Sequence, residues 1–262
     1  MKSARARRVP RHAPRLALAL AFPFSSALAQ SAAPTLPAVT VTANSAQDQD
    51  LPAPYAGGQV AQGARLGMMG NQDVMDTPFN VTSYTPELIQ NQQAPTLADV
   101  MANDASVRFT TSSGHAYENF RIRGFDVNQN DVAINGMYGL APMGRTPLEF
   151  VERVEVLKGP NALFSGMAPS GAVGGTINLV PKRADDTPNA TFGVNWQGDG
   201  QLGTTIDAGR RFGDANQWGA RVNGAFSDGA TTLAGQSRKR EFLSLGLAYR
   251  GSALCASILA YH

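Results

Sequence analysis

The sequence predicts a small α+β domain over residues 71–185, followed by antiparallel β-strands over residues 190–262. Two observations carry this prediction. Helix-start signals and short apolar strands alternate as far as residue 183, over a length that suits a single core. From residue 190 the apolar residues recur at every second position, which is the period of a half-buried strand.

The first region is divided by helix caps and turn residues. Thr85-Pro86 gives a cap followed by proline at the first helical position, and Thr96 with Asp99 three residues later forms a capping box. Asn135-Gly136 predicts a two-residue hairpin turn, because both residues tolerate a positive φ. A helical turn is expected at residues 147–151 and a glycine-rich loop at residues 159–175. Strands are expected at residues 81–84, 107–109, 120–123, 154–158 and 176–180.

In the second region, large apolar residues alternate with small, amide or charged residues. The alternating segments are residues 192–196, 204–212, 218–227 and 243–250. Segments of about ten residues with this alternation are typical of transmembrane β-barrel strands, and aromatic residues near their ends fit the interfacial girdles. A soluble antiparallel sandwich is the alternative, since its strands alternate as well. Residues 228–240 are expected to form a polar loop.

The first 29 residues have the features of an export signal. Six basic residues and no acidic residue are followed by an apolar run to about residue 28, and Ala27-Leu28-Ala29 fits the small-residue cleavage rule. A short membrane anchor is the alternative, but the run is too short to span a bilayer and Pro23 interrupts it. Residues 30–70 are rich in Ala, Gln, Pro and Gly, so we expect a flexible segment.

The composition argues against nucleic-acid binding, a metal centre and catalysis. The chain has 22 basic and 20 acidic residues, and without the export signal 16 basic residues remain, with no basic stripe. Cys255 is the only cysteine and the three histidines are far apart, so no disulfide, metal site or histidine triad is expected. Ser165 and Ser170 lack the G-x-S-x-G frame of a nucleophile. We expect no cofactor and no enzyme.

Three stretches carry a family resemblance. Residues 121–125 read R-I-R-G-F, residues 131–136 form a strand and turn, and residues 152–183 run from E-R-V-E-V-L-K-G-P to G-G-T-I-N-L-V-P-K-R. They resemble the plug domain of TonB-dependent outer-membrane receptors, and residues 76–82 and 97–100 resemble the siderophore-receptor subgroup. The resemblance implies an α+β plug domain followed by antiparallel transmembrane β-strands of an incomplete 22-stranded β-barrel.

The resemblance also assigns a role to a β-prone part of the leader, where residues 39–42 alternate apolar and hydroxyl side chains. It implies that this part is the TonB box, which pairs as a strand with the periplasmic protein TonB. TonB acts with ExbB and ExbD in this family. The box residues are Leu36, Pro37, Ala38, Val39, Thr40, Val41, Thr42 and Ala43.

The implied ligand is a ferric siderophore, and the implied location is the cell outer membrane with its lipid. By chain order, outward-facing loops of the plug are expected to contact the ligand, because aromatic and cationic side chains suit an anionic ferric chelate. The predicted ligand contacts are Tyr117, Asn128, Gln129, Tyr138, Met143 and Arg145. The residues predicted to pair with barrel charges are Arg121, Arg123, Glu152, Arg153 and Glu155. Ordinary surface ion pairs are the alternative for this second set.

The chain is short for such a receptor. A tilted strand needs about nine to eleven residues, so residues 190–262 have room for about five strands. Five strands do not close a barrel around a plug. We therefore expect an N-terminal fragment, truncated within the barrel, that does not transport on its own. The alternative is a soluble, secreted plug-like module that binds TonB without transport.

Overall fold

The computed structural model describes residues 51–261 apart from positions 113, 172, 199 and 251–254. The predicted export signal and TonB box lie outside the described residues. The α+β domain contains, in chain order, β1 (Gly63–Arg65), η1 (Gly67–Met69), β2 (Asn71–Asp73), η2 (Val74–Asp76), β3 (Asn80–Tyr84), α1 (Pro86–Asn91), α2 (Leu97–Met101), β4 (Val107–Phe109), β5 (Phe120–Ile122), β6 (Phe125–Val127), η3 (Gln129–Asp131), β7 (Ala133–Ile134), β8 (Met137–Tyr138), β9 (Val151–Lys158), α3 (Ala162–Ser165) and β10 (Gly175–Pro181). The strand region contains β11 (Asn189–Gln197), β12 (Gln201–Phe212), β13 (Trp218–Ala230), β14 (Ser237–Arg250) and β15 (Cys255–Tyr261).

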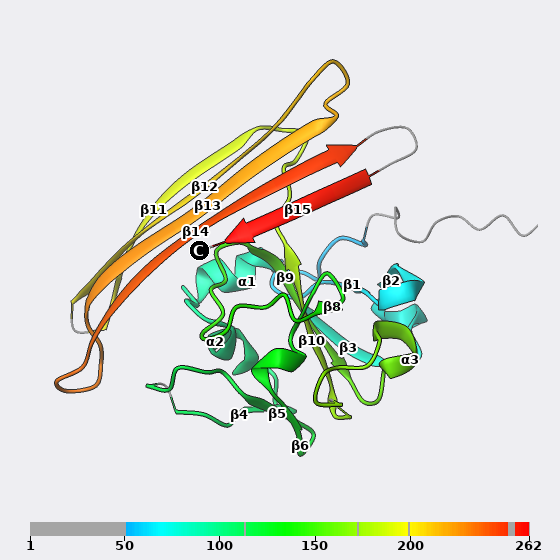
Figure 1. Cartoon of the computed structure of the whole chain (residues 1–262), viewed down its shortest axis with the longest axis horizontal. Helices are drawn as coiled ribbons and strands as arrows, with labels where there is room; N and C mark the ends of the chain where they lie inside the picture. Colours follow the sequence, from blue (N-terminus) through cyan, green and yellow to red (C-terminus); the bar gives the residue numbers. More distant parts are fainter. Residues whose placement is uncertain (1–50, 113, 172, 199, 251–254, 262) are drawn as a thin grey trace, which may run out of the picture. The chain divides into compact units, whose positions relative to one another are not determined.

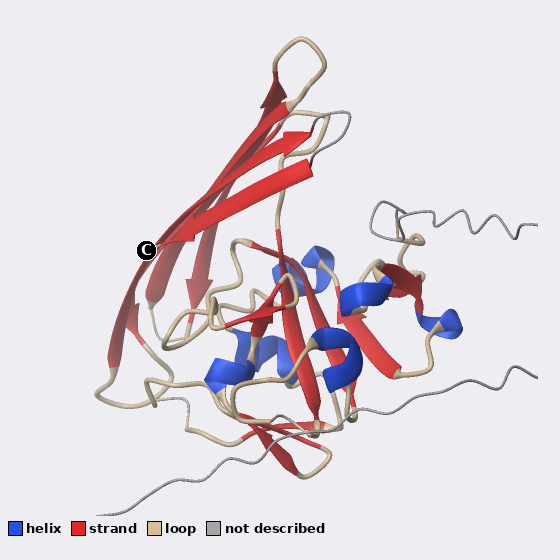
Figure 2. Ribbon diagram, turned by 45° about the vertical axis from the view of Figure 1, so that its right-hand side comes forward, coloured by secondary structure: helices blue, strands red, loops and turns tan. Residues whose placement is uncertain are grey.

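A five-stranded sheet in the order β3-β9-β10-β7-β8 runs through the α+β domain (Figure 2). β9 pairs antiparallel with both β3 and β10, and β7 adds parallel to β10. Every residue of β10 is buried, which explains why its sequence shows no alternation. A three-stranded sheet, β4-β5-β6, and the hairpin of β1 and β2 complete the domain.

The predicted helix cap and hairpin turn are confirmed. The Asp99 carboxylate accepts hydrogen bonds from Thr96 N at 3.0 Å and from Thr96 Oγ1 at 2.7 Å, which closes the capping box of α2. Asn135 and Gly136 have φ values of 52° and 80°, as the turn between β7 and β8 requires. The capped helix α2 then buries Leu97, Val100 and Met101 in the main core.

The structure begins the folded region earlier than the predicted boundary at residue 71. β1 pairs antiparallel with β2, and Ala64 and Leu66 are completely buried with Val81 and Leu157 in a small second core. The expectation of a flexible segment was therefore wrong for residues 51–70. The composition gave the wrong prediction because the segment has few apolar residues of its own. Burial of Leu66 against other parts of the domain is sufficient to fix it.

Three further expectations change in detail. Residues 147–151 make a single hydrogen-bonded turn, from Val151 N to the Leu148 carbonyl at 3.0 Å, and lead directly into β9. The glycine-rich stretch contains the short helix α3. β13 and β14 extend into the expected loop at residues 228–240, where Asp228 pairs with Lys239. These ends were missed because both faces of the sheet are polar there.

β11–β15 form one antiparallel sheet in which each strand neighbours the next (Figure 1). The predicted alternation is confirmed. Trp196 is 74% exposed on one face, whereas Arg221 and Asn223 on the opposite face are 8% and 2% exposed. The Trp218 ring lies 4.7 Å from the Tyr249 ring. Within the described residues, no helix combines the length and the apolar character that a membrane crossing requires.

A buried ion pair joins the segment after α2 to the end of β9. Asp104 Oδ2 lies 2.7 Å from Lys158 Nζ, and Oδ1 accepts hydrogen bonds from Ser106 N at 2.9 Å and Oγ at 2.6 Å. Burial opposes ionisation of Asp104, but the hydrogen bonds from Lys158 and Ser106 outweigh it and lower the pKa of this carboxyl. Burial and the charge of Asp104 raise the pKa of Tyr84.

Asp104→Asn is expected to lower the free energy of unfolding by about 2 kcal/mol at pH 7, because Lys158 loses a buried charged partner. Since the folded-state pKa of Asp104 is lowered, the ion pair contributes fully above the unfolded-state pKa of about 3.9. Its contribution is lost as the pH falls through the folded-state value. The difference between wild type and D104N should therefore shrink below about pH 4 in urea unfolding.

The matched control is Asp126→Asn, which removes a carboxylate from the exposed pair with Arg121. We expect no measurable change for D126N at any pH. A difference between wild type and D104N that stays constant down to about pH 2 would contradict the lowered pKa of Asp104.

Candidate functional site: a loop cluster and a charged seam

Two loops of the α+β domain bring Arg145 to the segment that carries His115 and Tyr117. Arg145 Nε donates to the His115 carbonyl at 3.2 Å, and Nη2 donates to the Ser112 carbonyl at 3.4 Å. His115 Nδ1 accepts from Tyr117 N at 3.1 Å, and the two rings lie 5.7 Å apart. The exposed His115 is thus a candidate contact residue that the sequence analysis missed, because an isolated histidine carries no pattern.

The other predicted contacts differ in their accessibility. Met143 is 73% exposed and lies two residues before Arg145. Asn128 is also exposed, and its backbone N–H donates to Asp131 at 2.9 Å at the start of η3. Tyr138 is half-buried, with its hydroxyl 3.1 Å from Thr176 Oγ1. Met143 and Asn128 are therefore open to a ligand, whereas the Tyr138 hydroxyl is engaged within the domain.

The prediction that Gln129 contacts the ligand was wrong. Its side chain is buried, and Oε1 accepts a hydrogen bond from Glu118 N at 3.0 Å. Nε2 donates to the carbonyl groups of Pro142, at 2.6 Å, and of Gly144. A glutamine in a loop looks like a surface group in sequence, but here its amide completes the hydrogen bonding of neighbouring loops.

Glu118 is a second buried polar residue beside Gln129. Its Oε2 accepts from Thr146 N at 2.8 Å, and its Oε1 accepts from Ala98 N at 3.3 Å. Burial raises the pKa of Glu118, although these backbone donors act in the opposite direction. The carboxyl group therefore links the first turn of α2 to the loop that carries Arg145.

Three of the residues predicted to pair with the barrel have partners inside the α+β domain. Arg121 pairs with Asp126 across the β5–β6 hairpin at 2.7 Å. Arg153 Nε lies 2.9 Å from Glu155 Oε1, and Glu155 is completely buried. The burial of Glu155 contradicts its predicted barrel contact. For Arg121 and Arg153 a contact with a barrel stays a prediction, beside the partners that they have on their own sheets.

The remaining two residues have different surroundings. Arg123 is exposed in the β5–β6 turn, with a φ of 50°, and its contact with a barrel stays a prediction. Glu152 lies 3.7 Å from Arg153. Burial raises the pKa of Glu152, while the charges of Arg153 and of Arg221 on β13 act to lower it. The electrostatic surroundings of Glu152 thus include the strand region.

A different set of polar residues joins the α+β domain to the strand region, and we call this set the seam. It consists of Glu149, Lys182, Asp207, Arg221, Asn223 and Arg240. Lys182 Nζ lies 2.8 Å from Asp207 Oδ2. Arg221 binds the same carboxylate in a bidentate manner, at 2.8 Å through Nε and 2.9 Å through Nη2. Arg221 Nη1 also donates to the Arg183 carbonyl at 2.6 Å.

The second half of the seam is centred on Glu149. Arg240 Nη1 donates to Glu149 Oε2 and to the Pro95 carbonyl, both at 3.1 Å. The Asn223 amide, oriented to satisfy its neighbours, donates to Asp207 Oδ1 at 3.0 Å and to the Glu149 carbonyl at 3.2 Å. Polar side chains of three strands thus bind one turn and one strand end of the domain.

Apolar contacts and a cavity accompany these polar contacts. The Phe150 and Phe242 rings lie 5.7 Å apart, and Phe242 belongs to the main core. A cavity of about 290 Å³ lies along the seam, with Ile89 and Leu148 beside the charged residues in its lining. The cavity has the volume and the polar lining that ordered water requires.

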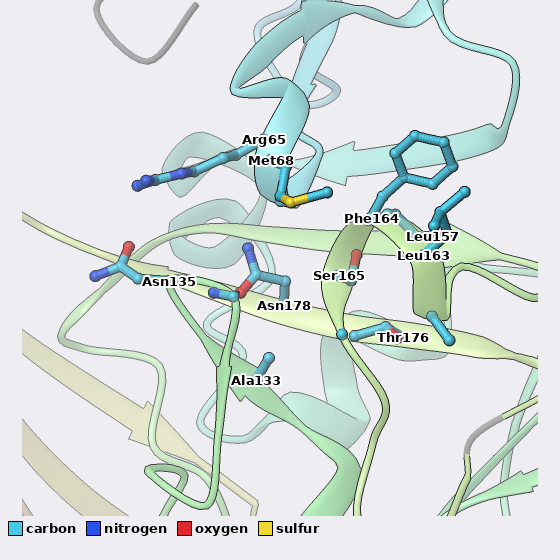
Figure 3. A pocket seen from close by; sticks show the side chains of 14 residues that line it. Arg65, Met68, Ala133, Asn135, Leu157, Leu163, Phe164, Ser165, Thr176 and Asn178 are labelled. Carbon is cyan, nitrogen blue, oxygen red and sulfur yellow. The ribbon is translucent and has the colours of Figure 1, made fainter. Parts of the chain in front are cut away.

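Another cavity, of about 430 Å³, opens between η1, α3 and the central sheet (Figure 3). Its polar lining includes Asn178 and Thr176, whose side chains already bind Glu155 and Asn161 at 2.8 and 3.1 Å. None of the predicted ligand contacts lines it. In the part of the chain that the structure describes, no group of three or more His, Cys, Asp or Glu residues is placed to hold a metal ion.

Comparison with known protein families matches residues 73–176 to the TonB-dependent receptor plug domain. The match includes α1, α2 and α3 and ends at the second residue of β10.

Curated proteins with similar sequences extend the match into the strand region. The ferrichrome receptor FcuA of Yersinia enterocolitica is 42% identical over 226 residues, which cover 84% of this chain and 30% of that protein. A probable TonB-dependent siderophore receptor, PiuA of Acinetobacter baumannii, is 28% identical over 89% of this chain and 29% of its own length. This chain therefore spans about 30% of the length of these curated relatives.

Solved structures share the arrangement of domain and strands. BauA, the ferric preacinetobactin receptor from Acinetobacter baumannii, superposes with a TM-score of 0.76 at 43% identity, over 79% of this chain and 31% of that chain. The pyoverdine receptor FpvA of Pseudomonas aeruginosa superposes with a TM-score of 0.68 at 18% identity, over 80% of this chain and 31% of that chain. The second likeness shows the fold alone.

The seam predicts a measurable coupling between Glu149 and Arg240. We expect a double-mutant cycle of Glu149→Gln and Arg240→Gln to give a coupling free energy of about 1.5 kcal/mol, because both side chains are mostly buried. Urea unfolding in detergent micelles measures it. The pair of Lys239 and Glu241 on the same strand, which is exposed, is the control and should show no coupling. Equal coupling in the two pairs would refute a special role for the seam.

Proposed function

We propose, because the chain belongs to the TonB-dependent receptors, that it forms the leader, plug and first strands of an outer-membrane importer of ferric siderophores. One observation carries the proposal. A plug domain over residues 73–176 is followed directly by strands whose apolar face is exposed and whose polar face binds the plug through the seam. An importer needs this arrangement, because its strands contact lipid on one side and a polar lumen on the other.

The direction of the apolar face argues against a soluble sandwich. A sandwich would cover the apolar face with a second sheet and leave the polar face in water. Here Phe192, Trp196 and Leu243 are exposed, while Asn223 and Ser244 are buried on the opposite face. Lipid is the environment that suits such a surface. The same observation disfavours the alternative of a soluble module that binds TonB without transport.

The coupling to energy is assigned to residues 36–43 of the leader. A barrel in the outer membrane has no ATP beside it, so a partner must transmit energy from the inner membrane. We propose that this segment adds as a strand to TonB, which acts with ExbB and ExbD. The first strand that the structure describes after the leader is β1, and Leu66, which follows it, packs against Val81 and Leu157 of the central sheet. Tension on the leader would therefore act directly on the plug.

The loop cluster, which we define as residues 110–119, 128–131 and 139–147, is the proposed ligand-binding surface of the plug. Tyr117 and His115 offer aromatic faces, Arg145 offers a cation and Met143 an exposed apolar contact. This combination suits a ferric siderophore, and the similar receptors FcuA and BauA are named for ferrichrome and ferric preacinetobactin. Iron arrives inside the chelate, so we propose no resident cofactor.

The remaining barrel is proposed to lie in sequence beyond this chain, which spans about 30% of the length of its curated relatives. A plugged barrel of this size has about 22 strands. Five strands expose sheet edges and enclose no lumen. Accordingly, the 262-residue chain alone is expected to bind without transporting.

Val41→Pro, made in the complete receptor of the native host, tests the proposed function under iron limitation. Proline removes a backbone donor, so strand addition at the leader fails. We expect V41P to abolish energy-dependent uptake of radiolabelled ferrichrome or ferric preacinetobactin, while binding of the same chelates to isolated outer membranes stays at the wild-type level. The matched control, Ala46→Pro, places proline in the same leader outside the box and should retain both activities.

Wild-type uptake by V41P would show that the coupling segment lies elsewhere. If neither chelate binds and the protein is recovered from the periplasm instead of the outer membrane, the soluble-module alternative replaces the importer.

A further inference from the structure

We infer that Gln129 and Glu118 form a buried polar hub that holds the loop cluster in its ligand-binding arrangement. Both are positioning residues, because neither side chain reaches the surface. The binding consequence rests on the proposed function, whereas the structural role is independent of it.

The backbone N–H of Gln129 and both polar atoms of its side-chain amide form hydrogen bonds to neighbouring loops. Its N–H donates to Asn119 Oδ1 at 3.1 Å, and its Oε1 accepts from Glu118 N at 3.0 Å. Its Nε2 donates to the carbonyls of Pro142 and Gly144. One side chain therefore connects all three segments of the loop cluster.

Glu118 extends the hub to the helix below. Its two carboxyl oxygens accept from Thr146 N at 2.8 Å and Ala98 N at 3.3 Å. Leu97 N donates to the Thr146 carbonyl at 3.2 Å, so Thr146 is tied to α2 directly through its carbonyl and, through Glu118, by its N–H. Because α2 packs in the main core, the hub transfers the rigidity of the core to the loops.

The anchored positions adjoin the candidate contacts along the chain. Glu118 follows Tyr117, and Thr146 follows Arg145. Pro142 and Gly144 flank Met143, so the backbone on both sides of this exposed side chain is held. Three of the four candidate contacts around Arg145 are thus next to a residue that the hub binds. Residues fixed in this way lose little conformational freedom when a ligand binds.

The loops of the cluster contain little helix or strand, so few backbone hydrogen bonds hold them in place. Loops with few backbone pairs are ordered by side-chain hydrogen bonds or by water. An amide and a carboxyl side by side, both buried, provide donors and acceptors that apolar residues lack. Removing the Nε2 donor of Gln129 leaves the partly buried carbonyls of Pro142 and Gly144 without this partner.

Gln129→Glu tests the hub with almost no change in shape. The variant keeps an acceptor for Glu118 N but replaces Nε2 by an oxygen, which cannot donate to Pro142 and Gly144. We expect trypsin to cleave the Arg145–Thr146 bond about tenfold faster in Q129E than in the wild-type chain. The exposed Arg123–Gly124 bond in the same samples reports general access and should not change.

The control is Asn130→Glu, which introduces the same charge at an exposed position of the same turn. N130E should be cleaved at Arg145 at the wild-type rate. If Q129E folds and its Arg145 bond is cleaved no faster than in N130E, the hub does not hold the loop and the inference is overturned.

Hydrogen exchange of the wild-type chain decides the question even if Q129E does not fold. The amides of Glu118 and Thr146 donate to buried side chains, so they should exchange at rates close to those of the β9 amides. Exchange at the rate of an unstructured peptide at both positions would refute the hub.

For uptake, loss of the hub should weaken the apparent affinity for the chelate and leave the maximal rate unchanged. Q129E made in the complete receptor should raise the half-saturating concentration for uptake of radiolabelled ferrichrome or ferric preacinetobactin by cells about tenfold. The maximal rate per receptor should stay within about twofold of wild type, because the leader and the seam are untouched. A lower maximal rate with unchanged half-saturation would contradict a positioning role. Failure of outer membranes that contain the wild-type receptor to bind either chelate would refute the proposed ligand class and leave the trypsin result standing.

Discussion

The polar face of β12–β14 constrains how the rest of the chain is built. Most large apolar side chains of these strands point away from the α+β domain, so apart from Phe242 and Ala225 the domain meets glycine, amide and charged groups. A charge that is partly removed from water needs a partner, because its desolvation is costly. Asp207 and Arg221 satisfy each other and also bind Lys182 and the Arg183 carbonyl. The polar face of the strands therefore explains why Lys182 and the Arg183 carbonyl, which follow β10, have charged partners there.

The seam and the main core hold the molecule together by different physics. The main core around β9 and β10 is made of apolar side chains. If the strands separate, the free energy gained by burying these side chains is lost in full. Ion pairs of the seam regain hydration when they separate, so their net contribution is small compared with the strength of each contact. The polar cavity beside Glu149 and Lys182 already provides space for water. Separation along the seam is consequently less costly than separation within the domain.

Local patterns were sufficient for most elements, and long-range contacts explain the failures. The capping box at Thr96, the turn at Asn135 and the alternation of the barrel strands depend on neighbours a few residues away, so the sequence predicted them. The burial of Gln129 depends on carbonyls 13 and 15 residues distant, and that of Leu66 depends on β3 and β9. The seam residues could not be paired in advance, because Glu149 and Arg240 are 91 positions apart.

β1 and the β7–β8 turn are linked to β9 and β10 through neighbouring polar side chains. Glu155 of β9 accepts from Arg65 N of β1 at 2.9 Å and from Asn178 Nδ2 of β10 at 2.8 Å. Asn178 Oδ1 accepts in turn from Gly136 N in the β7–β8 turn. If β1 leaves, Glu155 keeps Asn178 and Arg153 as partners, while the pairing with β2 and the small core around Leu66 are lost. The strand nearest the leader is thus held by contacts whose removal leaves the buried carboxylate of the sheet paired.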